Sequence, residues 1–230
     1  MLESMRKHMS WMMWGVVALI TVTFLFFGIR TTDVGGRTIA KVGDDVITVD
    51  EYNRTYRNLV DNMRDLLKDK FDDSYAKTLR TQALQDLIVG RLFVQEAERI
   101  GLRVTDEELQ AVIMRTPAFA RDGRFDKTIY DRLLDRINMS PAAFEASQRE
   151  FLLRQKLEQM IRDGVMVSEP ELAAAYQRQY PKAKPGDYEK NKETFRQTYV
   201  AGKQRDALTA FLAGLQSRIP IKVDEKSLAL

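Results

Sequence analysis

The stretch "TPAFARDGRFDKTIYDRLLDRINMSPAAFEASQREFLLRQKLEQMI", residues 116–161, predicts two consecutive helices with a marked break before each. Asp122-Gly123 is a turn signal, because aspartate hydrogen-bonds its own nearby backbone and glycine tolerates left-handed angles. Ser140-Pro141 supplies an N-cap followed by proline at the first helical position, so a long helix is expected from there to about Arg162. The helix between these two signals should bury an i, i+4 stripe made of Phe125, Ile129, Leu133 and Ile137.

Toward the N-terminus, the sequence predicts three further helices with their own start and stop signals. Capping-box patterns at 48–51 and 105–108 (Thr-x-x-Glu) open the first and the third, since each threonine and glutamate can bond the other's backbone amide. The first should run to about Lys68, and the third should stop at Thr116-Pro117, because the residue before proline disfavours helical angles. The second, from about Ser74 to Ile100, should end at Gly101 in a left-handed turn.

Toward the C-terminus, the sequence predicts a short helix and then a long one. Ser168-x-x-Glu171 opens the short helix, which carries Leu172 and Tyr176 on its apolar face. A crossing rich in proline and lysine, "PKAKPGD" at 181–187, separates it from a long helix expected from about residue 188 to residue 217.

Short β-like segments flank this helical region. Residues 40–42 and 46–48 surround the turn Gly43-Asp44-Asp45 and predict a hairpin, while "IPIKV" at 219–223 predicts one more strand. A lone two-stranded hairpin is only marginally stable in water, so we expect 219–223 to pair with it. The acidic pairs at 44–45 and 72–73 are interpreted as turn and cap residues rather than as metal ligands or acid-base groups.

Residues 9–29, "MSWMMWGVVALITVTFLFFGI", contain no charged side chain. As a helix this length spans about 30 Å, which matches the hydrocarbon thickness of a bilayer. We predict an uncleaved transmembrane anchor, over the alternatives of a core helix or a cleaved signal peptide, because bulky aromatics occupy the would-be cleavage site. The basic flank at Arg6 and Lys7 places the N-terminus in the cytoplasm. The aromatic residues expected at the membrane are Trp11, Trp14, Phe24 and Phe27.

Charge and composition exclude several classes of function. Arg6, Lys7 and Arg30, set against Glu3, supply most of the formal net charge of +3, so the remainder is nearly neutral and nucleic acid is a poor partner. Cysteine is absent, and the single histidine, His8, precedes the predicted span. Histidine-based triads, HExxH zinc sites and thiolate chemistry are therefore not expected outside the membrane. The sequence indicates no catalytic, cofactor-binding or metal-binding residue, while carboxylate-pair chemistry stays open.

Five aromatic residues in the central helices receive two interpretations. Packing in the core is expected for most of them, because large apolar side chains are usually buried. The alternative is that some line a groove between short helices, where apolar peptide docks. These residues are Phe119, Phe125, Tyr130, Phe144 and Phe151.

Three segments carry a resemblance to a known family. "IAKVGDDVITVDEY", "LRTQALQDLIVGRLFVQEAERIGLRVTDEEL" and the opening stretch resemble the N-terminal chaperone module of the SurA and PpiD families. The order of basic N-terminus, single span, tether, strand and helices is similar to the PpiD type, in which one helix ties a periplasmic folding factor to the bacterial inner membrane. The resemblance covers about residues 1–180 and resumes more weakly at 187–223. In that family a parvulin-type prolyl isomerase domain occupies the interval that has shrunk here to 181–187.

The resemblance implies a mainly α fold: one transmembrane helix and a SurA-N-like helical chaperone domain, with a small β element joining its N- and C-terminal parts. We expect an anchor (1–30), a tether (31–38), the chaperone domain (39–180), a linker (181–187) and a C-terminal helix and strand packed back on that domain (188–230).

The implied function is an inner-membrane-anchored periplasmic chaperone without ATP, cofactor or isomerase activity. Its partners would be unfolded or newly exported chains, the lipid bilayer and the secretion translocon. A dedicated assembly or scaffold subunit for one folded partner is the alternative, and an active isomerase is disfavoured. Client-binding residues are not assigned.

Overall fold

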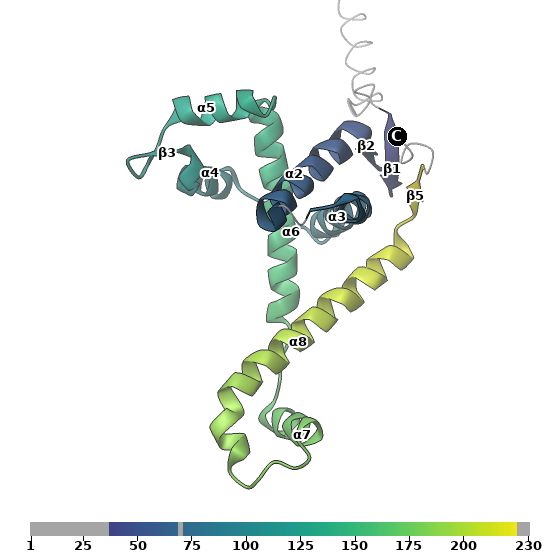
Figure 1. The fold of residues 1–230 in the computed structure, drawn as a ribbon, viewed down its shortest axis with the longest axis vertical. Helices are drawn as coiled ribbons and strands as arrows, with labels where there is room; N and C mark the ends of the chain where they lie inside the picture. The colour runs from purple at the N-terminus through teal and green to yellow at the C-terminus, as the bar shows by residue number, and fades with distance from the viewer. Residues whose placement is uncertain (1–36, 69–70, 225–230) are drawn as a thin grey trace, which may run out of the picture.

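A computed structural model describes residues 37–68 and 71–224, and most of them are helical. Helix α6 stands as a central pillar, with α2, α3 and a small sheet on one side of its upper half and α4 and α5 on the other (Figure 1). Helix α8 rises diagonally from α7, at the opposite end of the molecule, to the sheet. The helices are α2 (Val49–Leu67), α3 (Asp73–Arg99), α4 (Asp106–Arg115), α5 (Lys127–Arg136), α6 (Pro141–Asp163), α7 (Glu169–Gln179) and α8 (Asp187–Arg218), with a 3-10 turn η2 (Pro117–Phe119).

The helix starts predicted from the sequence are confirmed. Thr48 and Ser168 cap α2 and α7 through their side-chain oxygens, and Ser140 caps α6 ahead of its first-turn proline. At Thr105 both halves of the capping box form, so the threonine and Glu108 each accept from the other's backbone amide. Gly101 adopts the left-handed angle that ends α3, with φ of +85°.

The two ends of the described chain meet in one antiparallel sheet with strand order β2-β1-β5. Strand β1 (Thr38–Val42) pairs with β2 (Asp45–Thr48) on one side and with β5 (Ile221–Val223) on the other. In the second pairing, Ala40 lies opposite Val223. The predicted pairing of 219–223 with the N-terminal hairpin is therefore confirmed.

The turn between β1 and β2 requires glycine. Gly43 has a φ of +58°, and a Cβ atom there would lie 2.9 Å from Oε1 of Gln95. The Gln95 amide in turn donates to the carbonyl of Val42 at 2.8 Å and to the carboxylate of Asp45 at 2.6 Å. Helix α3 thus holds the hairpin in place, and Asp45 has the structural role that its position in a turn predicted.

The main hydrophobic core lies where the sheet, α3, α6 and α8 come together. Its fully buried side chains include Ile39 from β1, Leu92 from α3, Leu157 from α6 and Leu215 from α8. A second, smaller cluster joins α7 to the first half of α8. It is built from Leu172, Ala175, Tyr176 and Phe195.

The predicted stripe on the helix after Asp122-Gly123 is wrong at both ends. Phe125 lies outside the helix, in a two-residue strand β4 (Arg124–Phe125) that pairs with β3 (Ala120–Arg121), because the turn closes a hairpin. Helix α5 then starts after Asp126, which caps it, and buries Tyr130 and Leu134. Ile137 follows the last helical residue and is 53 % exposed, since the chain turns away at Asn138 with φ of +53°.

The predicted membrane anchor at 9–29 and the start of the tether lie outside the described residues. Within residues 37–68 and 71–224, none of the helices combines the length and the apolar character that crossing a bilayer requires.

Candidate functional site

A lobe formed by α4, η2, the β3–β4 hairpin, α5 and the start of α6 encloses a cavity of about 400 Å³, which we call the lobe pocket. This volume lies within the range of protein sites that hold small ligands, about 300–1,000 Å³. Its lining comes from four elements. The lining residues are Asp106, Leu109, Gln110, Ile113, Met114, Phe125, Lys127, Tyr130, Glu145 and Arg149.

The floor of the lobe pocket is apolar. Leu109 and Ile113 project from successive turns of α4 and are buried, while Phe125 and Tyr130 contribute aromatic rings from β4 and α5. Met114 stands at the mouth and is 50 % exposed. A flexible thioether at an open apolar site adapts to side chains of different shape. The pocket is therefore suited to receive large apolar side chains without selecting one shape.

An aromatic cluster packs around Tyr130, whose side chain lines the pocket. Phe119 contacts Tyr130 at 5.1 Å and Phe144 at 5.6 Å between ring centroids, both edge to face. The Tyr130 and Phe144 rings meet at 5.8 Å. Core packing is confirmed for Phe119 and Tyr130, which are both buried, and Tyr130 also lines the cavity as the alternative interpretation expected.

Of the other aromatic residues considered from the sequence, Phe125 is partly buried and lines the pocket. Phe151 is an exception to the core packing expected for most of these residues, because it is 52 % exposed. Phe151 lies on α6 two residues from the buried Leu153, and positions two apart on a helix face in nearly opposite directions.

Charged side chains surround the mouth of the lobe pocket. Arg149 donates to Asp106 at 2.7 Å and to the carbonyl of Val104 at 2.6 Å, which ties α6 to the start of α4. Lys127 pairs with Asp131 one turn along α5, at 2.6 Å. Glu145 forms no ion pair with any residue that the structure describes. Lys127 and Arg149 thus each have an acidic partner, whereas Glu145 has no basic partner among the described residues.

Tyr130 combines burial with an unused hydroxyl. Its side chain is 6 % exposed, and its hydroxyl finds no hydrogen-bond partner in the part of the chain that the structure describes. Burial raises the pKa of Tyr130, and the nearby charges of Glu145 and Asp131 raise it further. The hydroxyl therefore stays protonated at neutral pH and remains a hydrogen-bond donor.

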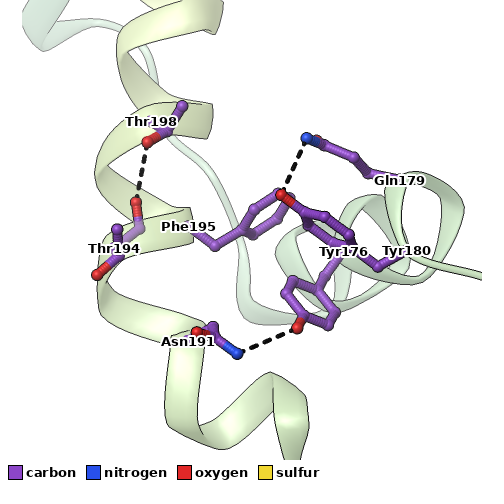
Figure 2. A pocket seen from close by; sticks show the side chains of 7 residues that line it. All are labelled: Tyr176, Gln179, Tyr180, Asn191, Thr194, Phe195 and Thr198. Carbon is purple, nitrogen blue, oxygen red and sulfur yellow. Dashed lines mark hydrogen bonds between the residues drawn. The ribbon is translucent and has the colours of Figure 1, made fainter. Parts of the chain in front are cut away.

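A second cavity of about 280 Å³, the α7–α8 pocket, lies at the opposite end of the molecule. Figure 2 shows the rings of Tyr176, Tyr180 and Phe195 gathered between the two helices. The hydroxyl of Tyr176 accepts from Asn191 at 3.4 Å, and that of Tyr180 accepts from Gln179 at 3.3 Å. Its tyrosine hydroxyls are thus matched within the protein, unlike that of Tyr130.

Ion pairs clamp α7 onto α8. Glu169 pairs with Lys192 at 2.8 Å and also with Arg196. Glu171 accepts from Lys203 and from the Tyr199 hydroxyl, each at 3.1 Å. These bonds, led by that from Lys203, hold the pKa of Glu171 below its usual value. Ion pairs at the surface therefore hold α7 against α8, in addition to the packing of the aromatic cluster between the two helices.

The residues named from the sequence relate to these pockets only in part. Trp11, Trp14, Phe24 and Phe27 lie outside the described residues, as does His8. Among residues 37–68 and 71–224, no group of three or more histidine, cysteine, aspartate or glutamate side chains is arranged to hold a metal ion. Sequence reasoning did not find Met114 and Glu145, because no local pattern distinguishes a pocket residue from other exposed helical positions.

Comparisons with known proteins agree with this architecture. The SurA-like N-terminal domain family matches residues 1–158. The periplasmic chaperone PpiD of Escherichia coli (strain K12) is 29 % identical over 165 residues, which is 68 % of this chain and 26 % of the relative. PpiD of Haemophilus ducreyi is 25 % identical over 168 residues, or 70 % of this chain and 27 % of the relative. The match thus spans about a quarter of the length of these curated relatives.

A solved structure from Campylobacter jejuni shares the fold. It comes from work that describes the virulence factor PEB4 and the periplasmic protein Cj1289 as structurally related SurA-like chaperones. The similarity covers 82 % of this chain and 99 % of that one, with a TM-score of 0.53 and 15 % sequence identity. At this identity the likeness bears on the fold alone.

Proposed function

The chain belongs to the SurA-like N-terminal domain family, and we propose that it is an ATP-independent chaperone that holds unfolded or newly translocated polypeptides. The observation that carries this proposal is the lobe pocket, an apolar cavity that opens at a charged rim. Apolar surface of this kind, rimmed by polar groups, marks sites for proteins or ligands. Weak and reversible capture there would slow the aggregation of a client.

Holding rather than isomerisation is the activity proposed. Between α7 and α8 the chain has only the crossing at 180–186, where the family resemblance places an isomerase domain. The single histidine, His8, falls in the predicted cytoplasmic segment. A peptide-isomerisation assay on the 230-residue chain should give no rate above background, and robust activity would overturn this part of the proposal.

We propose further that residues 9–29 anchor the chain in the bacterial inner membrane, with the N-terminus in the cytoplasm and the helical body in the periplasm. The relatives named periplasmic chaperone support this location. Anchoring near the secretion translocon, a proposed partner, would raise the effective concentration of chaperone where clients emerge. The chain has two tryptophans, both inside the proposed span, so vesicles of brominated lipid should quench its tryptophan fluorescence.

Aggregation assays test the holdase proposal. The 230-residue chain should suppress the aggregation of several unrelated denatured proteins, and Met114→Gln should weaken that suppression, because it makes the mouth of the lobe pocket polar. Ile137→Gln is the matched control, since Ile137 is 53 % exposed against 50 % for Met114 and does not line the pocket. Equal loss in the two variants would remove the lobe pocket from the mechanism.

The alternative, a scaffold subunit for one folded partner, predicts a different result. Such a protein would leave the denatured proteins to aggregate and would retain one partner at a fixed ratio in a pull-down from cell extract. That combination would replace the chaperone proposal.

A further inference from the structure

We infer that the lobe pocket selects extended segments in which a large apolar side chain is flanked by lysine or arginine. This inference rests on the proposed function, because it concerns which polypeptides that function would hold. It follows from the charges at the mouth, the chemistry of the floor and the unused donor at Tyr130.

Counting Asp131, three acids and two bases surround the mouth of the pocket, and Glu145 is the acid that has no ion-pair partner among the described residues. Lys127 is paired with Asp131, and Arg149 with Asp106, so neither base is free to attract an acidic client. Glu145 is exposed, lines the same cavity and forms no ion pair within the described residues. A basic residue next to an inserted apolar side chain would meet this carboxylate, whereas an acidic residue would be repelled.

The overall charge of the protein gives no reason for a preference for basic peptides. The formal net charge is +3, and Arg6, Lys7 and Arg30 against Glu3 supply most of it, so the body that carries the pocket is nearly neutral and offers no long-range attraction for basic peptides. A measured preference for basic flanks must therefore come from a local group. That condition makes the inference specific to Glu145.

The Tyr130 hydroxyl adds a contact that does not depend on sequence. A buried donor without an acceptor costs roughly 1–3 kcal/mol. The hydroxyl oxygen itself is buried, while the Tyr130 side chain lines the cavity, so a client carbonyl would reach it through a shift of the ring. An extended client exposes backbone carbonyls beside each side chain, and one of them would then supply the missing acceptor. A folded client pairs nearly all of its buried backbone carbonyls internally, so this contact would favour unfolded segments over folded ones.

Three fluorescein-labelled peptides test the charge preference. They share one apolar core and are flanked on both sides by lysine, glutamine or glutamate, and Kd is measured by fluorescence anisotropy with the full chain. The lysine-flanked peptide should bind about two- to fivefold more tightly than the glutamate-flanked one, which is the range of an exposed ion pair. The ratio should fall at high salt, because the charges are screened.

Substitutions test whether Glu145 causes the preference for lysine-flanked peptides. Glu145→Gln should bring the ratio close to one, and Glu145→Lys should reverse it. Glu189→Gln on α8 removes the same charge away from the pocket and should leave the ratio unchanged. Tyr130→Phe should weaken all three peptides alike, by about two- to tenfold.

The possible failures are distinct. If all three peptides bind with equal Kd, or if Glu145→Gln leaves the ratio intact, the charge preference is wrong while the holdase proposal stands. If Tyr130→Phe changes no Kd, the carbonyl contact is wrong. If no peptide binds at millimolar concentration, the inference and the proposed function fail together.

Discussion

The backbone amide of Gly43 donates a hydrogen bond to the carbonyl of Pro220 at 2.9 Å. This bond joins the turn of the N-terminal hairpin to the segment that leads from α8 into β5. It places residues from opposite ends of the described chain in direct contact. The stability of the whole fold therefore depends on the backbone geometry at Gly43.

Gly43→Ala should destabilise the protein by about 1–3 kcal/mol, because the left-handed angle is strained for alanine and its Cβ would crowd Gln95. Gly202→Ala is the control, since no heavy atom lies near its Cβ position inside α8. That change should stabilise by about 0.5–1 kcal/mol through helix propensity. Urea unfolding measures both, and equal effects of the two changes would contradict the account of the turn.

The Glu96 carboxylate should make part of the stability depend on pH. Glu96 is 4 % exposed and accepts from Arg99 at 2.7 Å and from Arg218 at 3.4 Å, which ties α3 to the end of α8. Hydrogen bonding from Arg99, followed by that from Arg218, lowers the pKa of Glu96 below its ordinary 4.5. Ionised Glu96 therefore adds fully to the free energy of unfolding above its ordinary pKa of 4.5. This stabilisation is lost as the pH falls through the lowered pKa of the folded state.

Glu96→Gln should accordingly destabilise the protein at pH 7 by about 1–3 kcal/mol, and the gap to the unmodified chain should narrow below pH 4. Glu98→Gln on the exposed side of the same helix should change little at either pH. Urea midpoints at pH 7 and 3.5 give the comparison. If the stability difference between the unmodified chain and Glu96→Gln grew at acid pH, the pKa of Glu96 could not be lowered in the folded state.

The corrected packing of α5 predicts opposite results at two neighbouring apolar positions. Leu134 is 2 % exposed, so Leu134→Ala should cost about 2–5 kcal/mol through the lost contacts and the cavity. Ile137 is 53 % exposed, so Ile137→Ala should stay within about 0.5 kcal/mol. Thermal unfolding measures both variants. Comparable losses of stability would show that Ile137 is buried, as the stripe predicted from the sequence requires.

The small cluster between α7 and α8 should unfold separately from the main core. Phe195 packs against Tyr176 at 5.1 Å and against Tyr199 at 5.7 Å, and it belongs to the second cluster alone. Phe195→Ala should therefore speed amide hydrogen exchange throughout α7 while leaving that of α3 nearly unchanged. Leu92→Ala in the main core should speed exchange in both helices.

The sequence predicted the helices well because their ends carry local chemistry. Thr105 with Glu108, Ser140 with Pro141, and Gly101 each determine a helix terminus through bonds within a few residues, and such bonds can be recognised without knowing the fold. The pairing of β5 with β1 was predicted by a different argument, since an isolated hairpin needs a third strand.

Features that depend on distant contacts were not predictable in this way. The two-residue strands β3 and β4 are too short to show an alternating pattern, so Phe125 was assigned to the following helix. The lobe pocket draws its lining from α4, β4, α5 and α6, and only the fold brings Met114 and Glu145 to the same cavity. Phe151 shows the converse, since an aromatic residue at helical spacing can still face solvent.

The antiparallel sheet imposes an order on biosynthesis. Strand β1 is made before every helix that the structure describes, but its neighbour β5 is made only after all of them. Until β5 leaves the ribosome, one edge of β1 stays unpaired, and the long loop between these two strands can close only after all the described helices have been made. The three-stranded sheet can therefore form only once every helix that the structure describes has been synthesised.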